Sequence, residues 1–149
     1  MSTLSPFAAV NHVGFVVTDL VAAGALLVDT LGFERIVERR GHIAFPGTDA
    51  ARRLFGVDPQ ATAEFAFFRL GEAVVELLEW RGPGRSTTPA GNSDLGGRHL
   101  ALTVDDMEAA IERLRVVVGV EVREPNERGY VYVKTPVGLE VQLIPSVAS

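Results

Sequence analysis

The chain has 149 residues, of which 47% are hydrophobic and 22% are charged, so it has the composition of one globular domain and not of a disordered chain. A net charge of -5 with scattered Arg residues gives no electrostatic reason to bind nucleic acid or anionic lipid. The absence of Cys excludes disulfides and thiolate metal sites, so a metal would be held by His, carboxylate or amide groups. With no signal-peptide pattern and no bilayer-length apolar run, we expect a cytoplasmic protein.

The first predicted strand covers residues 10–17, an almost unbroken apolar run that is typical of a strand covered on both faces. Because side chains alternate along a strand, His12 lies on one face and an entirely apolar set lies on the other. A helical pattern follows, with Thr18 or Asp19 as its cap and Gly32 as its stop. This stretch therefore predicts one β-α unit.

The rest of the first half adds three predicted strands, over residues 33–39, 64–70 and 73–80. The last two strands form a hairpin by their spacing. Between the first two, residues 40–63 have a weak pattern and are interpreted as an insertion loop with one short helix over residues 49–55. Residues 82–97 are rich in Gly, Pro, Ser and Thr, and form either a linker or a mobile flap over a site.

The second half repeats the scheme, since Arg98-His99-Leu100-Ala101-Leu102-Thr103-Val104-Asp105 parallels the segment that begins at Asn11. Asp105 and Glu108 form a capping-box pattern for a helix that runs to about residue 118. Three more strands are predicted over residues 120–124, 129–134 and 139–144. We therefore predict one α+β domain of two βαβββ modules, about 9–81 and 98–145, around a curved mixed sheet.

Four positions in this repeat could carry chemistry. Aligned by pattern, Glu76 and Gln142 occupy equivalent places on the last strands, just as His12 and His99 do on the first strands. If all four side chains face a common cleft, two imidazoles and two oxygen donors suit a divalent Ni, Zn, Fe, Co or Mn ion. His42 has no matching partner and is interpreted as a surface or loop residue.

Four segments carry a resemblance to a known superfamily. They are Asn-His-Val-Gly-Phe-Val-Val-Thr-Asp-Leu from Asn11, Val-Val-Glu-Leu-Leu-Glu-Trp from Val74, Gly-Gly-Arg-His-Leu-Ala-Leu-Thr-Val-Asp-Asp from Gly96, and Thr-Pro-Val-Gly-Leu-Glu-Val-Gln-Leu-Ile from Thr135. In their order and spacing they resemble the vicinal oxygen chelate superfamily of glyoxalase I, methylmalonyl-CoA epimerase, extradiol dioxygenases, and fosfomycin and bleomycin resistance proteins. The pattern is most similar to the glyoxalase I-like and epimerase-like members.

The resemblance implies a glyoxalase-like cleft, often within a homodimer, that binds a small-molecule substrate at a divalent metal. It places the family's metal ligands on His12, Glu76, His99 and Gln142. Glyoxalase I and the epimerases usually have a carboxylate where this chain has Gln142, and an amide cannot take a proton at neutral pH. Glu140 lies two residues earlier on the same strand face and is an alternative, so the catalytic base would be Glu76 or Glu140.

Three functions are compatible with these residues. The first is a metal-dependent lyase or isomerase of glyoxalase type, which would move a proton on a hemithioacetal or an acyl thioester. The second is a resistance protein that binds an antibiotic without catalysis, in a cleft lined by aromatic side chains: Phe65, Phe67, Trp80, Tyr130 and Tyr132. The third is an Fe(II) extradiol dioxygenase, which Gln142 disfavours because those enzymes place a carboxylate there.

Overall fold

A computed structural model of the chain describes residues 5–47 and 49–147. The strands of the first sheet are β1 (Val13–Val16), β2 (Glu34–Ile43), β3 (Thr62–Leu70) and β4 (Ala73–Arg81). Those of the second are β5 (His99–Val104), β6 (Glu121–Val122), β7 (Val131–Lys134) and β8 (Glu140–Pro145). The helices are α1 (Leu20–Ala25), the π-helix η1 (Leu26–Thr30), α2 (Ala50–Phe55) and α3 (Met107–Arg115).

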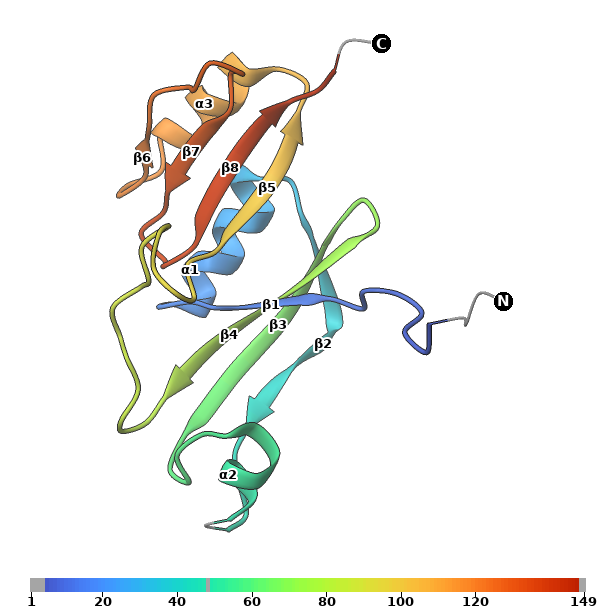
Figure 1. Cartoon of the computed structure of the whole chain (residues 1–149), viewed down its shortest axis with the longest axis vertical. Coiled ribbons are helices and arrows are strands. Elements are labelled where there is room, and N and C mark those ends of the chain that lie inside the picture. Colours follow the sequence, from blue (N-terminus) through green and yellow to red (C-terminus); the bar gives the residue numbers. More distant parts are fainter. Residues whose placement is uncertain (1–4, 48, 148–149) are drawn as a thin grey trace.

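The two sheets share one topology (Figure 1), with strand orders β1-β4-β3-β2 and β5-β8-β7-β6. In each sheet the first strand pairs in parallel with the last, and the other pairings are antiparallel. The β3–β4 hairpin turns over two residues, because Leu70 pairs with Ala73. These features confirm the predicted α+β fold of two like modules.

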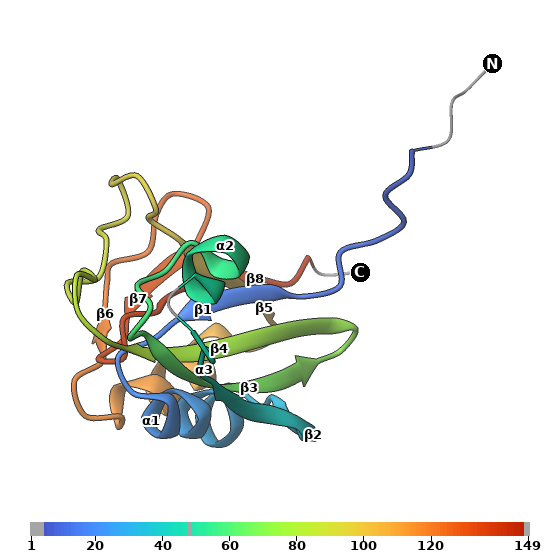
Figure 2. The same cartoon turned by 90° about the horizontal axis from the view of Figure 1, so that it is seen from below.

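The core lies on one face of each sheet. Phe68, Leu77 and Leu27 are fully buried in a hydrophobic cluster that also contains Val133 and Val141 of the second sheet. Figure 2 shows α1 and α2 on opposite sides of the first sheet, so α1 covers the core face and leaves the other face to α2. One continuous core therefore joins the modules, and the opposite faces of the sheets remain for a site.

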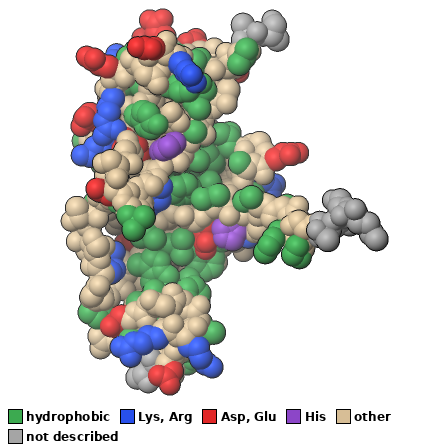
Figure 3. Space-filling view, viewed as in Figure 1, with side chains coloured by type: hydrophobic (Ala, Val, Ile, Leu, Met, Phe, Trp, Pro, Cys, Tyr) green, Lys and Arg blue, Asp and Glu red, His purple; other side chains and the backbone are tan. Residues whose placement is uncertain are grey.

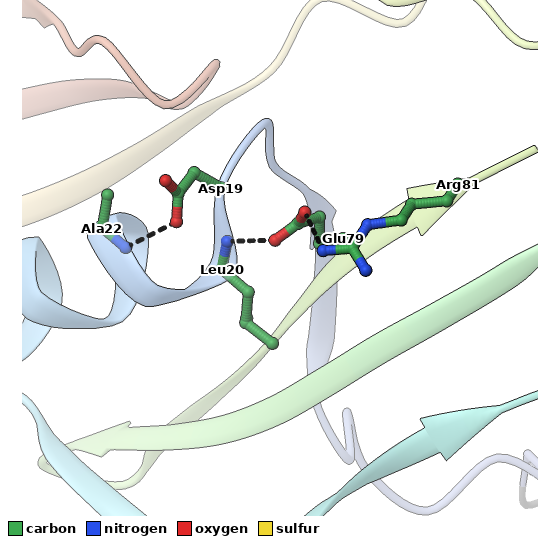
Figure 4. A network of polar contacts seen from close by, with 5 residues as sticks. All are labelled: Asp19, Leu20, Ala22, Glu79 and Arg81. Atoms are coloured by element: carbon green, nitrogen blue, oxygen red, sulfur yellow. Dashed lines mark hydrogen bonds and ion pairs between the residues drawn. The ribbon is translucent and has the colours of Figure 1, made fainter.

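Two carboxylates cap the start of α1 (Figure 4). Asp19 accepts a hydrogen bond of 2.9 Å from the backbone N–H of Ala22, so Asp19, not Thr18, is the side-chain cap. Glu79 on β4 accepts a second bond, 2.8 Å long, from the N–H of Leu20, and is itself paired with Arg81 at 3.0 Å. Glu79 thus fixes the helix to the sheet and is occupied in that role.

Some predicted elements were wrong in detail. β1 is an edge strand bonded only to β4, and Val13 and Val16 are 50% and 41% exposed, so it is not covered on both faces. β2 continues through the start of the predicted insertion loop, because a register shift after Ile36 lets the strand resume pairing at Arg40. In the second half the helix cap is Asp106, which accepts from Ala109 N, instead of Asp105.

The helical segments are all short. None of those in the described part of the chain is long and apolar enough to cross a membrane.

Candidate metal-binding site

The first module presents a histidine and a carboxylate in direct contact. The Nε2 atom of His12 lies 3.2 Å from Oε2 of Glu76, and the two side chains are 32% and 17% exposed. On the other side of the ring, Nδ1 lies 2.7 Å from Oδ1 of Asn11. Because that amide oxygen can only accept, Nδ1 carries the hydrogen and Nε2 faces the carboxylate. An imidazole nitrogen and a carboxylate oxygen held in this way suit a shared cation, with Asn11 orienting the ring.

Gly14 makes room for this pair. It lies directly opposite Glu76 in the parallel β1–β4 register. A Cβ atom at Gly14 would lie 3.6 Å from Oε2 of Glu76, so a branched side chain there would crowd the carboxylate. The absence of a side chain lets Glu76 lie over β1, toward His12.

Aromatic rings form the floor beside the pair. Phe67 pairs with Glu76 across β3 and β4, and its ring contacts that of His12 edge to face, with centroids 5.0 Å apart. The ring of Phe65 follows on the same face, with its centroid 6.0 Å from that of Phe67, and Trp80 lies beyond Phe65. The guanidinium of Arg39 covers Phe67 at 3.8 Å, a contact that no sequence signal indicated.

The second module presents the other three predicted site residues on one face. His99 pairs with Glu140, and Gln142 pairs with Ala101, so all three side chains point to the same side of the sheet. His99 is exposed and contacts the ring of Tyr132 with centroids 5.4 Å apart. Gln142 is only 9% exposed.

Glu140 is engaged by two partners. Its Oε1 atom forms an ion pair with Arg123 and accepts a hydrogen bond of 3.2 Å from the side-chain amide of Asn92. Its side chain is 13% exposed. Sequence reasoning missed both partners. Arg123 directly follows β6 and Asn92 lies in the segment between the modules, and no local sequence pattern connects either residue to β8. The carboxylate of Glu140 is therefore already occupied by a cation and a hydrogen-bond donor.

The two halves of the site do not meet within one chain. Among residues 5–47 and 49–147, no group of three or more His, Asp or Glu side chains lies close enough to hold a metal ion. Figure 3 shows histidine side chains apart on one face, with hydrophobic side chains between them. His12 with Glu76, and His99 with Gln142, are thus two candidate half-sites, each with a nitrogen and an oxygen donor of the type that a borderline divalent metal prefers. His42 lies on β2 opposite Glu64, outside both.

Comparison with known proteins agrees with this architecture. Residues 11–130 match the family described as Glyoxalase/Bleomycin resistance protein/Dioxygenase superfamily. A 2-epi-5-epi-valiolone epimerase from Actinomyces sp. is 35% identical over 146 residues, which cover 91% of this chain and 78% of that protein.

Two solved structures show the same fold. A glyoxalase family protein from Bacillus cereus superposes with a TM-score of 0.76 at 21% identity, over 99% of this chain and 100% of the other. A mutant of the fosfomycin resistance protein FosX from Listeria monocytogenes, solved with Mn(II) and 1S,2S-dihydroxypropylphosphonic acid, superposes with a TM-score of 0.62 at 16% identity, over 95% and 94%. The family match, the epimerase relative and the shared fold lead to one conclusion: the chain belongs to the glyoxalase/bleomycin resistance protein/dioxygenase superfamily.

Proposed function

We propose that this protein is a metal-dependent isomerase that epimerises a small hydroxy ketone, with Glu76 as the base. The contact of 3.2 Å between His12 Nε2 and Glu76 Oε2 carries the proposal, because it sets a carboxylate beside a metal-type imidazole on an open sheet face. The epimerase relative, 35% identical, supports an isomerase over the lyase, oxygenase and drug-binding alternatives. The substrate named for that relative, 2-epi-5-epi-valiolone, is the first compound to test.

The complete site would be built by two copies of the chain. The His12–Glu76 half-site of one copy would face the His99–Gln142 half-site of its partner, and together they would hold one divalent ion. β1 and β5, which carry or adjoin the histidines, are both edge strands of their sheets. Val13 and Val16 leave apolar surface exposed along β1, as expected of a strand that a second copy covers.

A divalent ion bound there would polarise a carbonyl oxygen and so acidify the neighbouring C–H bond. Glu76 would accept that proton, because it is the carboxylate of the site that pairs with no arginine among the described residues. Gln142 cannot accept it, and Glu140 is occupied by Arg123 and Asn92. A water molecule held in the cleft on the opposite face would give its proton to the same carbon and complete the inversion, and the hydroxide left behind would be neutralised by the proton that Glu76 took up.

The aromatic floor would give the substrate its orientation. Phe67 is buried at 6% exposure beneath the guanidinium of Arg39, and the half-buried Phe65 ring stands edge to face against it, so together they offer an apolar wall next to Glu76. A cyclic substrate packed against this wall would present one ring face to the carboxylate. Closure of the cleft by a second copy would exclude bulk water from the reacting carbon.

Proton exchange in heavy water tests the proposal. The protein, loaded in turn with Mn(II), Zn(II) or Ni(II), is incubated in D2O with 2-epi-5-epi-valiolone, and the product is followed by proton NMR. We expect deuterium at the inverted carbon, and a rate that falls by about 10²–10⁴ in Glu76→Gln. Exchange that persists in Glu76→Gln, or after chelation of all metal, would contradict the proposal.

Parallel arms separate the competing functions. The hemithioacetal of methylglyoxal and glutathione tests a glyoxalase-type lyase, and oxygen uptake with a catechol tests the dioxygenase. Tight binding of bleomycin by metal-free protein without any proton exchange would favour the binding module. We expect the epimerase arm alone to show turnover.

A further inference from the structure

A cavity of about 610 Å³ lies beside Trp80, between α2 and the segment that follows β4. The residues that line it include Arg52, Val57, Ala61, Trp80, Pro83 and Arg85. The ring of Trp80 is braced by Phe55 of α2, with centroids 6.1 Å apart. The cavity therefore has an aromatic wall set against two basic side chains.

This cavity continues the sheet face that carries the proposed base. Glu76 and Trp80 lie on the same strand four residues apart, so their side chains share one face. At the rise of an extended strand, this separation is about 13 Å. A substrate with a six-membered ring and one substituent spans most of the distance from Glu76 to Trp80. A long arginine side chain that reaches toward the substituent covers the rest.

The two arginines of the cavity are free to bind an anion. Within the described part of the chain, neither Arg52 nor Arg85 forms an ion pair or a side-chain hydrogen bond. Asp58, the carboxylate of the cavity wall, accepts a bond of 2.8 Å from Gln60 N and lies beyond ion-pair distance of both. By contrast, Arg81 nearby is already paired with Glu79.

Guanidinium groups without a carboxylate partner, set around an apolar wall, match the needs of a ligand with an anionic end and a carbon skeleton. They are also unexpected in a chain whose net charge is -5. Figure 3 shows basic side chains at the end of the molecule that carries α2. The cavity is thus suited to one part of a substrate whose other part lies at Glu76.

We propose that Arg52 and Arg85 bind an anionic group of the substrate, a phosphate monoester or a carboxylate, while Trp80 packs against its carbon skeleton. The inference rests on the proposed function, because it takes the reacting carbon to lie at Glu76. It narrows the substrate class to hydroxy ketones with an anionic group at the end remote from that carbon, so the neutral 2-epi-5-epi-valiolone would be turned over at a higher KM than an anionic substrate of this class. Arg53, the next residue of α2, does not line the cavity and gives a matched control.

Trp80 is the only tryptophan of the chain, so its fluorescence reports on this cavity directly. We would titrate the full-length protein, in EDTA and at constant ionic strength, with glucose 6-phosphate, glucuronate and glucose. We expect a saturable change with one or both anions and none with glucose, and the stronger anion identifies phosphate or carboxylate as the ligand chemistry. The Kd should rise about tenfold in Arg52→Ala and in Arg85→Ala, less in the Lys variants, and under twofold in Arg53→Ala.

Three results would overturn the inference. They are the absence of a saturable change with either anion, an unchanged Kd in Arg52→Ala and Arg85→Ala, and an equal loss of affinity in Arg53→Ala, which would indicate general surface charge. Circular dichroism and thermal melting check that each variant is folded. The titration contains no divalent metal, whereas the proposed proton exchange requires one. Anion binding is therefore tested independently of proton exchange. Exchange without anion binding would contradict this inference alone, and anion binding without exchange would support the cavity while contradicting the proposed function.

Discussion

Gln142 occupies in the second sheet the register position that Glu76 occupies in the first. Glu76 lies opposite Gly14 and Gln142 lies opposite Ala101, and each of these partners comes two residues after the histidine of its module. The repeat therefore places a carboxylate in one half-site and an amide in the other. The proposed site, built from both halves, would have one proton acceptor and one neutral oxygen donor.

Restoring a carboxylate at position 142 should tighten metal binding. In Gln142→Glu, a second negative ligand adds to the attraction for a divalent ion, and we expect Kd for Mn(II) to fall about tenfold or more. Without metal the same change should lower the melting temperature, because position 142 is only 9% exposed and a buried charge is costly. Calorimetric titration and melting with and without EDTA measure both effects. Gln60→Glu, on an exposed turn, is the control, and equal affinities in both variants would refute the assignment.

The two candidate bases should respond differently to the same substitution. Glu76→Gln should slow proton exchange by about 10²–10⁴, because it removes the proton acceptor. Glu140→Gln should leave the exchange rate within a few-fold, since Glu140 is already paired with Arg123 and Asn92. Single-turnover exchange in D2O compares them directly. A large loss of the exchange rate in Glu140→Gln with little loss in Glu76→Gln would contradict this assignment and identify Glu140 as the base.

Phe68 should be a principal contributor to stability. It is fully buried under α1, and the guanidinium of Arg35 lies 4.9 Å from its ring. We expect Phe68→Ala to lower the free energy of unfolding by about 3–5 kcal/mol in urea denaturation. Val37→Ala, at a position that is 62% exposed, should change it by less than about 0.5 kcal/mol. A loss below about 1 kcal/mol for Phe68→Ala would show that the core lies elsewhere.

Mixing inactive variants should restore activity if the site is shared between copies. His12→Ala and His99→Ala damage different half-sites, so a mixed dimer would keep one intact site. After subunit exchange, an equal mixture should recover about a quarter of the wild-type activity. A mixture of His12→Ala with Glu76→Gln should recover none, because both damage the same half-site. Recovery in both mixtures, or in neither, would contradict a shared site.

The sequence allowed the repeated parts of the fold to be predicted because their signal is local. The apolar runs that contain His12 and His99 indicate strands, and the twofold period of a strand then assigns the two histidines to equivalent faces. Gly56 ends α2 in a left-handed conformation with φ of 68°. The continuation of β2 through Gly41 escaped prediction, since it depends on a bulge and on pairing with β3, not on a pattern of its own.

The site could be predicted only in part, for a similar reason. The residue types and their faces follow from the repeat. The ion pair between Arg123 and Glu140, which spans 17 positions, depends on how separate segments pack. So does the separation of His12 from His99, because it is set by the packing of the two sheets around one core.

The central claim is that His12 and Glu76 of one copy share a single divalent ion with His99 and Gln142 of another. A crystal structure of Mn(II)-loaded protein, with the ion located by anomalous scattering, measures this most directly. We expect one anomalous peak per site, bound by these four side chains from two chains, with Glu140 still paired to Arg123. A peak held by Glu140, a peak held by one chain alone, or no peak at either histidine would contradict the claim.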